Sequence, residues 1–191
     1  MQCFVIMPFG NPKVDPTRAQ KLDAIYSQWI KPTVESISLT GLANDTIACH
    51  RADKEERPGE IISHIIENLT TSDIVIADLS GRNPNVFYEL GVRHAVRNNT
   101  ILISEDLDDI PFDLRGLRTI TYGYDPEHML KLKDSLARAI RAIHQRPETV
   151  DNPVQNFLYQ REMKGLAERA SLPGFTYIGL SLQRSRRSRK T

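Results

Sequence analysis

The sequence contains few cysteines and no long apolar run. Its two cysteines, Cys3 and Cys49, lie in separate predicted strands with no CxxC pair, so each is expected to be a buried free thiol in a reducing, cytoplasmic compartment. No apolar run approaches the ~20 residues that a membrane helix needs. The first residues, MQCFVIMPFG, lack the basic leader and cleavage site of a signal peptide and instead predict a strand. We therefore expect no membrane association.

Several motifs of cofactor chemistry are also missing. The chain has no HExxH and no cluster of ligands at metal spacing, so no metal is expected. It has no GxGxxG after the first strand and no GxxxxGK[ST], which argues against a dinucleotide-dependent oxidoreductase and against a P-loop enzyme. These absences predict a function that needs no cofactor.

Neither sign of charge prevails in the chain as a whole. The sequence has 25 Lys and Arg residues against 24 Asp and Glu residues, a net charge of +1, and 40% of its residues are hydrophobic, as in globular proteins. Residues 184–191 carry five of the positive charges and no acid, which leaves −4 on residues 1–183. This basic tail predicts a solvated terminus, and a nucleic-acid partner is not expected.

The order of apolar segments predicts an α/β fold. Short apolar runs alternate with helical patterns, which is the signature of a parallel sheet with helices on both faces. Five strands favour a doubly wound, flavodoxin-like sheet of order 2-1-3-4-5, whose ligand-binding switch point lies between the first and third strands. The predicted strands are Cys3–Met7, Asp45–Cys49, Ile74–Ala77, Thr100–Ser104 and Thr119–Tyr122.

Three of the intervening helices show apolar stripes at helical spacing. The helix that starts near Asp15 is expected to kink or shift at Pro32, which cannot continue the hydrogen-bond ladder. The side chains predicted to face the core are Leu22, Ile25 and Trp29 in this helix, Ile61, Ile62, Ile65, Ile66 and Leu69 in the next, and Leu130, Leu136, Ile140 and Ile143 in a helix over residues 126–144.

The domain is predicted to cover residues 1–146, followed by an appendix over residues 147–183. The appendix reads as a linker, an amphipathic helix and a short strand at Phe175–Leu180, and the basic tail of residues 184–191 follows it. It could dock on its own body or on a second subunit, and we expect a homo-oligomer.

The most informative stretch runs from the strand Ile74–Ala77 into a helix. Asp78 lies at the carboxyl end of this strand, where open α/β sheets bind their ligands. Residues 80–82 predict a turn, and Asn83, followed by proline, predicts the N-cap of the helix. Glu89 comes about a turn and a half later, so both carboxylates are predicted to face one crevice.

Two carboxylates in one crevice suit cleavage at an anomeric carbon. The positive end of the helix is expected to favour ionised Glu89, as a nucleophile requires, while Asp78 holds or relays a proton. One acid attacks or stabilises the oxocarbenium-like carbon, and the other helps the leaving base depart. The residues alone also allow a structural explanation, in which Asp78 caps its loop and Glu89 is an ordinary helical side chain.

A ligand at this edge would meet residues from several strand ends. The turn could hold a phosphate through backbone N–H groups and the Arg82 guanidinium. Phe9 could stack on a base or serve only in packing, and Arg51 is either a ligand contact or a solvated loop charge. The predicted substrate-binding residues are Met7, Phe9, Gly10, Arg51, Ser80, Gly81, Arg82, Asn83 and Asn85.

The segment VIADLSGRNPNVFYELGVRHA is similar to the central motif of the nucleoside 2-deoxyribosyltransferase-like proteins, and MQCFVIMPFG and PFDLRGLR resemble an uncharacterised branch of that superfamily. The likeness covers about residues 1–145. It implies that Glu89, in Glu-Leu-Gly, is the nucleophile. Asn83 falls where characterised transferases carry an aspartate, and an Asn cannot act as a general acid. The fold also resembles, more distantly, Toll/interleukin-receptor (TIR) domains.

Two functions from different classes follow. The first is an N-glycosidase or deoxyribosyltransferase-like enzyme that cleaves the glycosidic bond of a nucleoside, nucleotide or NAD-like small molecule through Glu89. The alternative is a non-catalytic nucleotide-sensing or TIR-like assembly module that binds the same ligand in the same crevice. Recovery of free base distinguishes them, because only the enzyme releases it.

Overall fold

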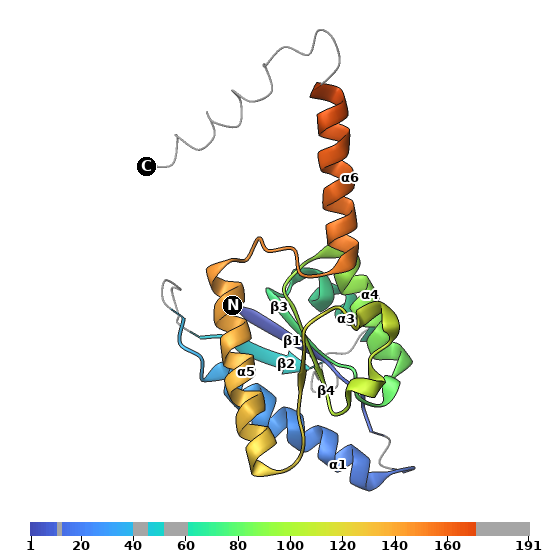
Figure 1. The fold of residues 1–191 in the computed structure, drawn as a ribbon. Coiled ribbons are helices and arrows are strands. Elements are labelled where there is room, and N and C mark those ends of the chain that lie inside the picture. Colours follow the sequence, from blue (N-terminus) through green and yellow to red (C-terminus); the bar gives the residue numbers. More distant parts are fainter. Residues whose placement is uncertain (11–12, 40–45, 52–60, 171–191) are drawn as a thin grey trace. The chain divides into compact units, whose positions relative to one another are not determined.

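A five-stranded parallel sheet forms the centre of the fold, as the sequence predicts. The structure, a computed structural model, describes residues 1–10, 13–39, 46–51 and 61–170, with side chains to residue 166. The strand order is β2-β1-β3-β4-β5 (Figure 1). All pairings are parallel, so the carboxyl ends of the strands meet at one edge. The strands are β1 (Gln2–Ile6), β2 (Ala48–Arg51), β3 (Ile74–Asp78), β4 (Thr100–Ser104) and β5 (Thr119–Thr121).

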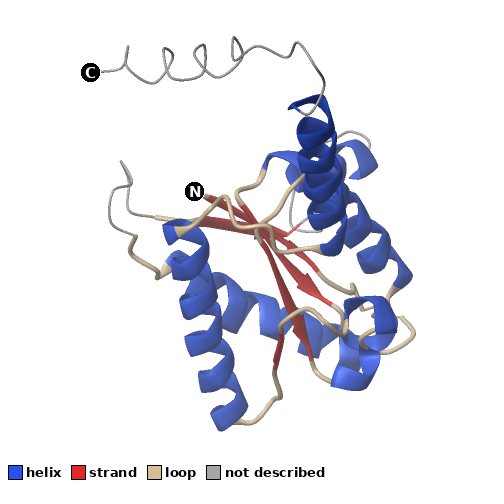
Figure 2. Cartoon of the chain, turned by 45° about the horizontal axis from the view of Figure 1, so that its top comes forward, coloured by secondary structure: helices blue, strands red, loops and turns tan. Residues whose placement is uncertain are grey.

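Helices cover both faces of the sheet (Figure 2). Successive side chains of β1 point to opposite faces: Cys3 and Val5 belong to one core cluster, and Phe4 and Ile6 belong to the other. One layer contains α1 (Pro16–Ala24), η1 (Ile25–Ile30), α2 (Lys31–Glu35) and α5 (Pro126–Gln145), and the other contains α3 (Ile61–Thr71) and α4 (Pro84–Val96). The described connections contain the single-turn 3₁₀ segments η3 (Ser80–Arg82), η4 (Leu107–Asp109) and η5 (Phe112–Leu114).

The predicted shift at Pro32 is present as a change of helical register. Residues Ile25–Ile30 form a π-helical stretch between α1 and α2, and the Lys31 N–H bonds to the Tyr26 carbonyl oxygen, five residues back. Proline has no N–H to donate and its ring crowds the preceding turn, so the wider π turn accommodates it without ending the helix.

In two helices, some side chains of the predicted apolar stripe lie outside the core. Leu69 is fully buried on α3, but Ile61 and Ile62 in the first turn are 71% and 70% exposed. On α5, Leu130 is exposed, and Met129 and Leu132 are buried in its place. These core assignments were wrong because helical periodicity predicts which face is apolar, not the length over which a neighbour covers it.

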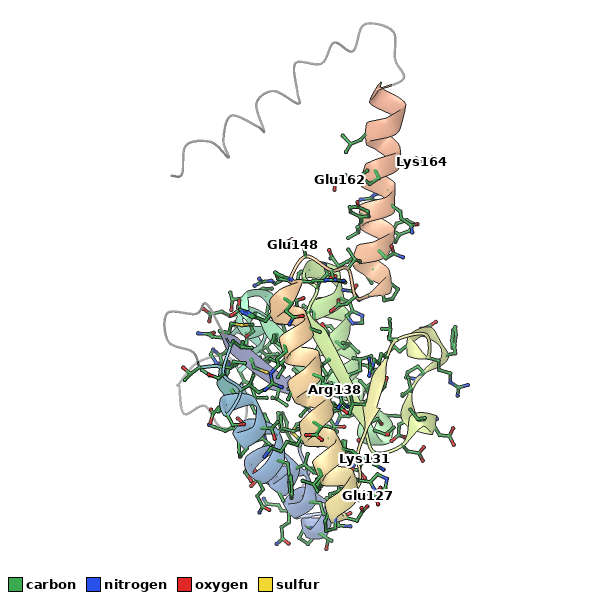
Figure 3. The ribbon with its side chains drawn as sticks, turned by 60° about the vertical axis from the view of Figure 1, so that its left-hand side comes forward. Glu127, Lys131, Arg138, Glu148, Glu162 and Lys164 are labelled. Carbon is green, nitrogen blue, oxygen red and sulfur yellow. The ribbon has the colours of Figure 1, made fainter. Side chains whose placement is uncertain are left out.

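The solvent face of α5 is charged. Glu127, Lys131 and Arg138 lie along one side of this helix (Figure 3). The Lys131 Nζ donates to the Glu127 Oε1 at 2.6 Å, an exposed pair at i, i+4 spacing. This arrangement explains why α5 is amphipathic: its other side packs on the sheet.

A buried arginine ties together the amino ends of β3 and β4. Arg93 of α4 has no exposed surface, and its guanidinium donates to five backbone carbonyls. Burial lowers the pKa of Arg93 to about 10, so the side chain stays charged at neutral pH. The accepting oxygens belong to Leu69, Ser72, Asp73, Asn98 and Asn99 at distances of 2.5–3.3 Å.

Residues beyond 155 group into a second compact unit. The structure describes its helix, the larger part of α6 (Pro153–Ala170), which carries the exposed side chains of Phe157, Tyr159 and Met163. The predicted strand Phe175–Leu180 and the basic tail lie outside the described residues. In the part of the chain that is described, every helix is too short or too polar to cross a membrane.

Candidate functional site

Asp78 is the centre of a buried polar network at the carboxyl end of β3. Its Oδ1 accepts from the Ser80 N–H at 3.0 Å and from the Ser80 Oγ at 2.6 Å, and its Oδ2 accepts from the Tyr122 hydroxyl at 2.8 Å. Burial raises the pKa of Asp78, and the bonds from Ser80 and Tyr122 oppose that rise. Because the carboxyl group is fully buried and its oxygens are engaged by three donors, its geometry suits holding the turn in place more than touching a ligand.

Glu105, which follows β4, extends this network to the other strand ends. Its Oε1 accepts from the Arg18 Nη1 at 2.5 Å and from the Tyr124 hydroxyl at 2.8 Å. The Tyr122 hydroxyl lies 3.3 Å from the same oxygen, and the Glu105 N–H donates to the Ser80 Oγ at 2.8 Å. The loops after β3, β4 and β5 and the start of α1 are therefore cross-linked at one point.

The turn after β3 adopts backbone conformations that favour glycine. Gly81 and Arg82 have φ of +69° and +53°. The Gly81 N–H donates to the Asp109 Oδ2 at 2.7 Å, and the Arg82 guanidinium contacts the Asp109 carboxylate and the Asp108 carbonyl. The donors that were predicted to hold a phosphate thus contact a side chain of the protein itself.

Asn83 is the N-cap of α4, as predicted. Its Oδ1 accepts from the backbone N–H groups of Asn85 at 2.9 Å and Val86 at 3.4 Å, and Pro84 occupies the first helical position. The Asn85 side chain is exposed. The Asn83 amide oxygen is therefore engaged in capping, which an aspartate at this position would also perform.

Glu89 is half-buried on α4, whose neighbours in the sheet are β3 and β1. Among the described residues it forms no hydrogen bond and no ion pair, and burial alone raises its pKa to about 7. Burial opposes the expected effect of the helix N-terminus on Glu89, because the field of the helix end falls off within the first turn.

A cleft of about 440 Å³ opens between α1 and the carboxyl ends of β1 and β2. Phe9 and Gly10 line it from the loop after β1, and Arg51 lines it from β2. Neither Asp78 nor Glu89 is among the described residues of its wall. The side of α1 and η1 that faces the cleft contributes Gln20, Asp23, Ser27 and Gln28.

Arg51 is held in the wall of this cleft by several contacts. Its side chain is almost fully buried, and its Nη2 donates to the Asp23 Oδ1 at 2.9 Å. Its Nη1 lies 3.3 Å from the Met7 sulfur, and its guanidinium carbon is 4.5 Å from the centroid of the Tyr26 ring and 5.8 Å from that of Phe9. Phe9 itself is half exposed and forms part of the wall.

The predicted residues therefore separate into three groups. Phe9, Gly10 and Arg51 line the cleft, and Met7 contacts Arg51 through its sulfur. Asp78 and Ser80 are buried in the network, and the remaining predicted residues belong to the turn and α4. Four residues of the network were not predicted as site residues: Arg18, Glu105, Tyr122 and Tyr124. Glu105 and Tyr122 follow β4 and β5, so the strand-end rule that selected Asp78 would have found them.

Gly10 lies where the loop after β1 touches α1. A Cβ at this position would lie 2.3 Å from the Ala19 Cα, so Gly10→Ala is expected to move the loop and to destabilise the protein by about 1–3 kcal/mol. Urea unfolding measures the effect. Gly91→Ala is the control, because a Cβ there meets no atom within 4 Å and the change within a helix should be neutral or stabilising. Equal unfolding midpoints for wild type and Gly10→Ala would contradict the close contact.

Comparison with known proteins shows a distant structural likeness. No protein-family model and no curated protein sequence matches the chain. Among solved structures, a 2-deoxyribosyltransferase from Leishmania mexicana aligns with a TM-score of 0.40 and 17% sequence identity. The alignment covers 55% of this chain and 65% of that protein, so the chain spans less than two thirds of its length. The likeness to TIR domains stays a prediction.

Proposed function

We propose that this protein cleaves the N-glycosidic bond of a nucleoside-like substrate, with Glu89 as the nucleophile. The observation that carries the proposal is the state of Glu89, a half-buried carboxyl that contacts no donor among the described residues. Protein structures usually pair a desolvated polar group with a partner. Glu89 lies on the helix that follows β3 and has no such partner, so a bound ligand could supply the contact that the protein does not.

The reaction needs one nucleophile and one leaving base. The Glu89 carboxylate attacks the anomeric carbon, the carbon–nitrogen bond breaks, and the base leaves with the bonding electrons and takes up a proton from solvent water. Water then hydrolyses the glycosyl ester in a hydrolase, whereas a second base attacks it in a transferase. Because Asn83 cannot supply a proton as an acid, this chemistry suits hydrolysis of substrates whose base leaves readily.

In this proposal, residues at the other strand ends position Glu89 and the substrate. Asp78 fixes Ser80 and thereby the turn that leads into α4. Phe9 and Arg51 present a ring and a cation at the cleft beside β1. In this proposal Asp78 is a positioning residue, and the cleft receives the part of the substrate that does not react.

The test is a search for released base. Purified protein is incubated with a panel of ribonucleosides, deoxyribonucleosides, their 5′-monophosphates and NAD, and the products are separated and identified by mass spectrometry. The proposal requires free base from at least one member of the panel. A panel recovered intact would refute it, and binding without cleavage would favour the non-catalytic sensing module.

The raised pKa of Glu89 also predicts a pH dependence of stability. The folded protein binds this proton up to about pH 7, whereas an unfolded Glu releases it near 4.5, so its contribution is full below 4.5 and is lost as the pH rises through 7. Glu89→Gln removes that loss. Between pH 5 and pH 8 the variant should gain roughly 1–2 kcal/mol relative to wild type, after allowance for its partial exposure. Urea unfolding at both values measures the gain, and parallel pH profiles would contradict it.

A further inference from the structure

The turn after β3 already holds an anion, and that anion is Asp109. The Gly81 N–H donates to its Oδ2 at 2.7 Å, and the Arg82 Nε lies 3.8 Å from its Oδ1. The Arg82 Nη2 also donates to the neighbouring Asp108 carbonyl oxygen. A backbone N–H and a guanidinium that converge on one carboxylate are the donors that proteins also use to bind phosphate.

The backbone of the turn is shaped to present these donors. Gly81 and Arg82 are consecutive residues with positive φ, and the Gly81 N–H donates to the Asp109 carboxylate while the Arg82 N–H donates to the Leu79 carbonyl oxygen at 3.2 Å. A Cβ built at Gly81 would meet no atom within 4 Å, so the turn has open space beside it. Without the Asp109 carboxylate, the Gly81 N–H and the Arg82 guanidinium would lose this shared acceptor.

The loop that carries Asp109 is held firmly in place. The Asp106 Oδ1 accepts from the Asp108 N–H at 2.9 Å, and the Asp106 carbonyl accepts from the Ser104 Oγ at 2.7 Å. Ile110, the next residue after Asp109, is buried in the core under α4. The segment that carries Asp109 is therefore held at both ends, by Ser104 at the end of β4 and by Ile110 in the core, and this fixes the position of the Asp109 carboxylate at the turn.

We propose that Asp109 is a specificity residue that keeps phosphate out of this turn, so that the substrate is a nucleoside without a 5′-phosphate. The inference rests on the proposed function, because the turn leads directly into the helix that carries Glu89. A phosphate at Gly81 would have to displace the Asp109 carboxylate, because both anions would need the same two donors, the Gly81 N–H and the Arg82 guanidinium. Specificity of this kind arises from repulsion of the wrong ligand.

The first test measures binding of inorganic phosphate and does not depend on catalysis. Thermal unfolding is followed with increasing phosphate at constant ionic strength, with chloride as the reference ion. Wild type should show no stabilisation specific to phosphate, whereas Asp109→Ala should bind phosphate at least about 10-fold more tightly. Asp108→Ala is the matched control, because it removes the same charge from the same loop but leaves the Asp109 carboxylate at Gly81. Asp109→Ser, which also removes the carboxylate, is measured in its place if Asp109→Ala does not fold.

The second test measures the choice of substrate. The ratio of base release from a nucleoside to that from its 5′-monophosphate should favour the nucleoside in wild type. It should fall about 10-fold or more in Asp109→Ala and stay unchanged in Asp108→Ala. Faster base release from the monophosphate than from the nucleoside in wild type would overturn the proposal. Equal phosphate binding by wild type, Asp109→Ala and Asp109→Ser would also overturn it. Absence of base release from both substrates would instead refute the proposed function, and the phosphate titration would still decide the role of Asp109.

Discussion

Glu89→Gln is expected to reduce base release by at least about 1,000-fold, because the amide has nearly the shape of the carboxylate but cannot form the glycosyl ester. Substrate binding should change much less, since the substitution leaves the cleft and the turn intact. Release of base under saturating substrate, followed by chromatography, gives the rate. Circular dichroism of the variant should match that of wild type, because no hydrogen bond between described residues is lost.

The control for this variant is Glu127→Gln, which makes the same chemical change on the exposed face of α5 (Figure 3). It should retain full activity. The wild-type rate should also rise with pH through about 7, because only ionised Glu89 can attack and burial places its pKa there. A Glu89→Gln variant that keeps more than about a tenth of the wild-type rate would remove Glu89 from the role of nucleophile.

Arg93→Met should be the most destabilising single substitution considered, at about 3–5 kcal/mol. Methionine fills much of the space of the arginine stem but leaves five carbonyl oxygens without their donor. Each buried acceptor that loses its partner costs free energy, and water cannot reach the fully buried site to replace it. Urea unfolding gives the change in the free energy of unfolding.

Arg97→Met is the control for this second substitution. Arg97 lies one helical turn beyond Arg93 and donates to the carbonyls of Thr70 and Thr71, but its side chain is only partly buried. Its replacement should cost about 1 kcal/mol, because water can satisfy the released carbonyls. If the two variants unfold at the same urea concentration, the buried guanidinium does not stabilise the amino ends of β3 and β4 in the way proposed.

The architecture was predictable because it depends on local patterns. Apolar runs such as Ile74–Ala77 mark strands buried on both faces, and their alternation with helices permits few topologies. The Asn83 cap was predictable for the same reason, since an Asn before a proline and a helical pattern has a local physical meaning.

The contacts that shape the site were not predictable in this way, because they join residues distant in sequence. Asp109 reaches Gly81 from 28 positions away, and Tyr122 reaches Asp78 from 44 positions away. The burial of Arg93 was not predicted for a different reason. Arginine side chains normally lie at the surface, and no sequence pattern indicates that five backbone carbonyls surround this one.

The contacts of Arg93 lie at the edge of the sheet opposite to the candidate site. Its five bonds lie at the amino ends of β3 and β4, whereas the turn and the Asp78 network lie at the carboxyl ends of β3, β4 and β5, and the cleft lies at the carboxyl ends of β1 and β2. A combinatorial library that randomises the carboxyl-edge loops would leave this anchorage untouched. The chain should therefore serve as a scaffold for directed evolution, in which new ligand preferences are selected without loss of foldedness.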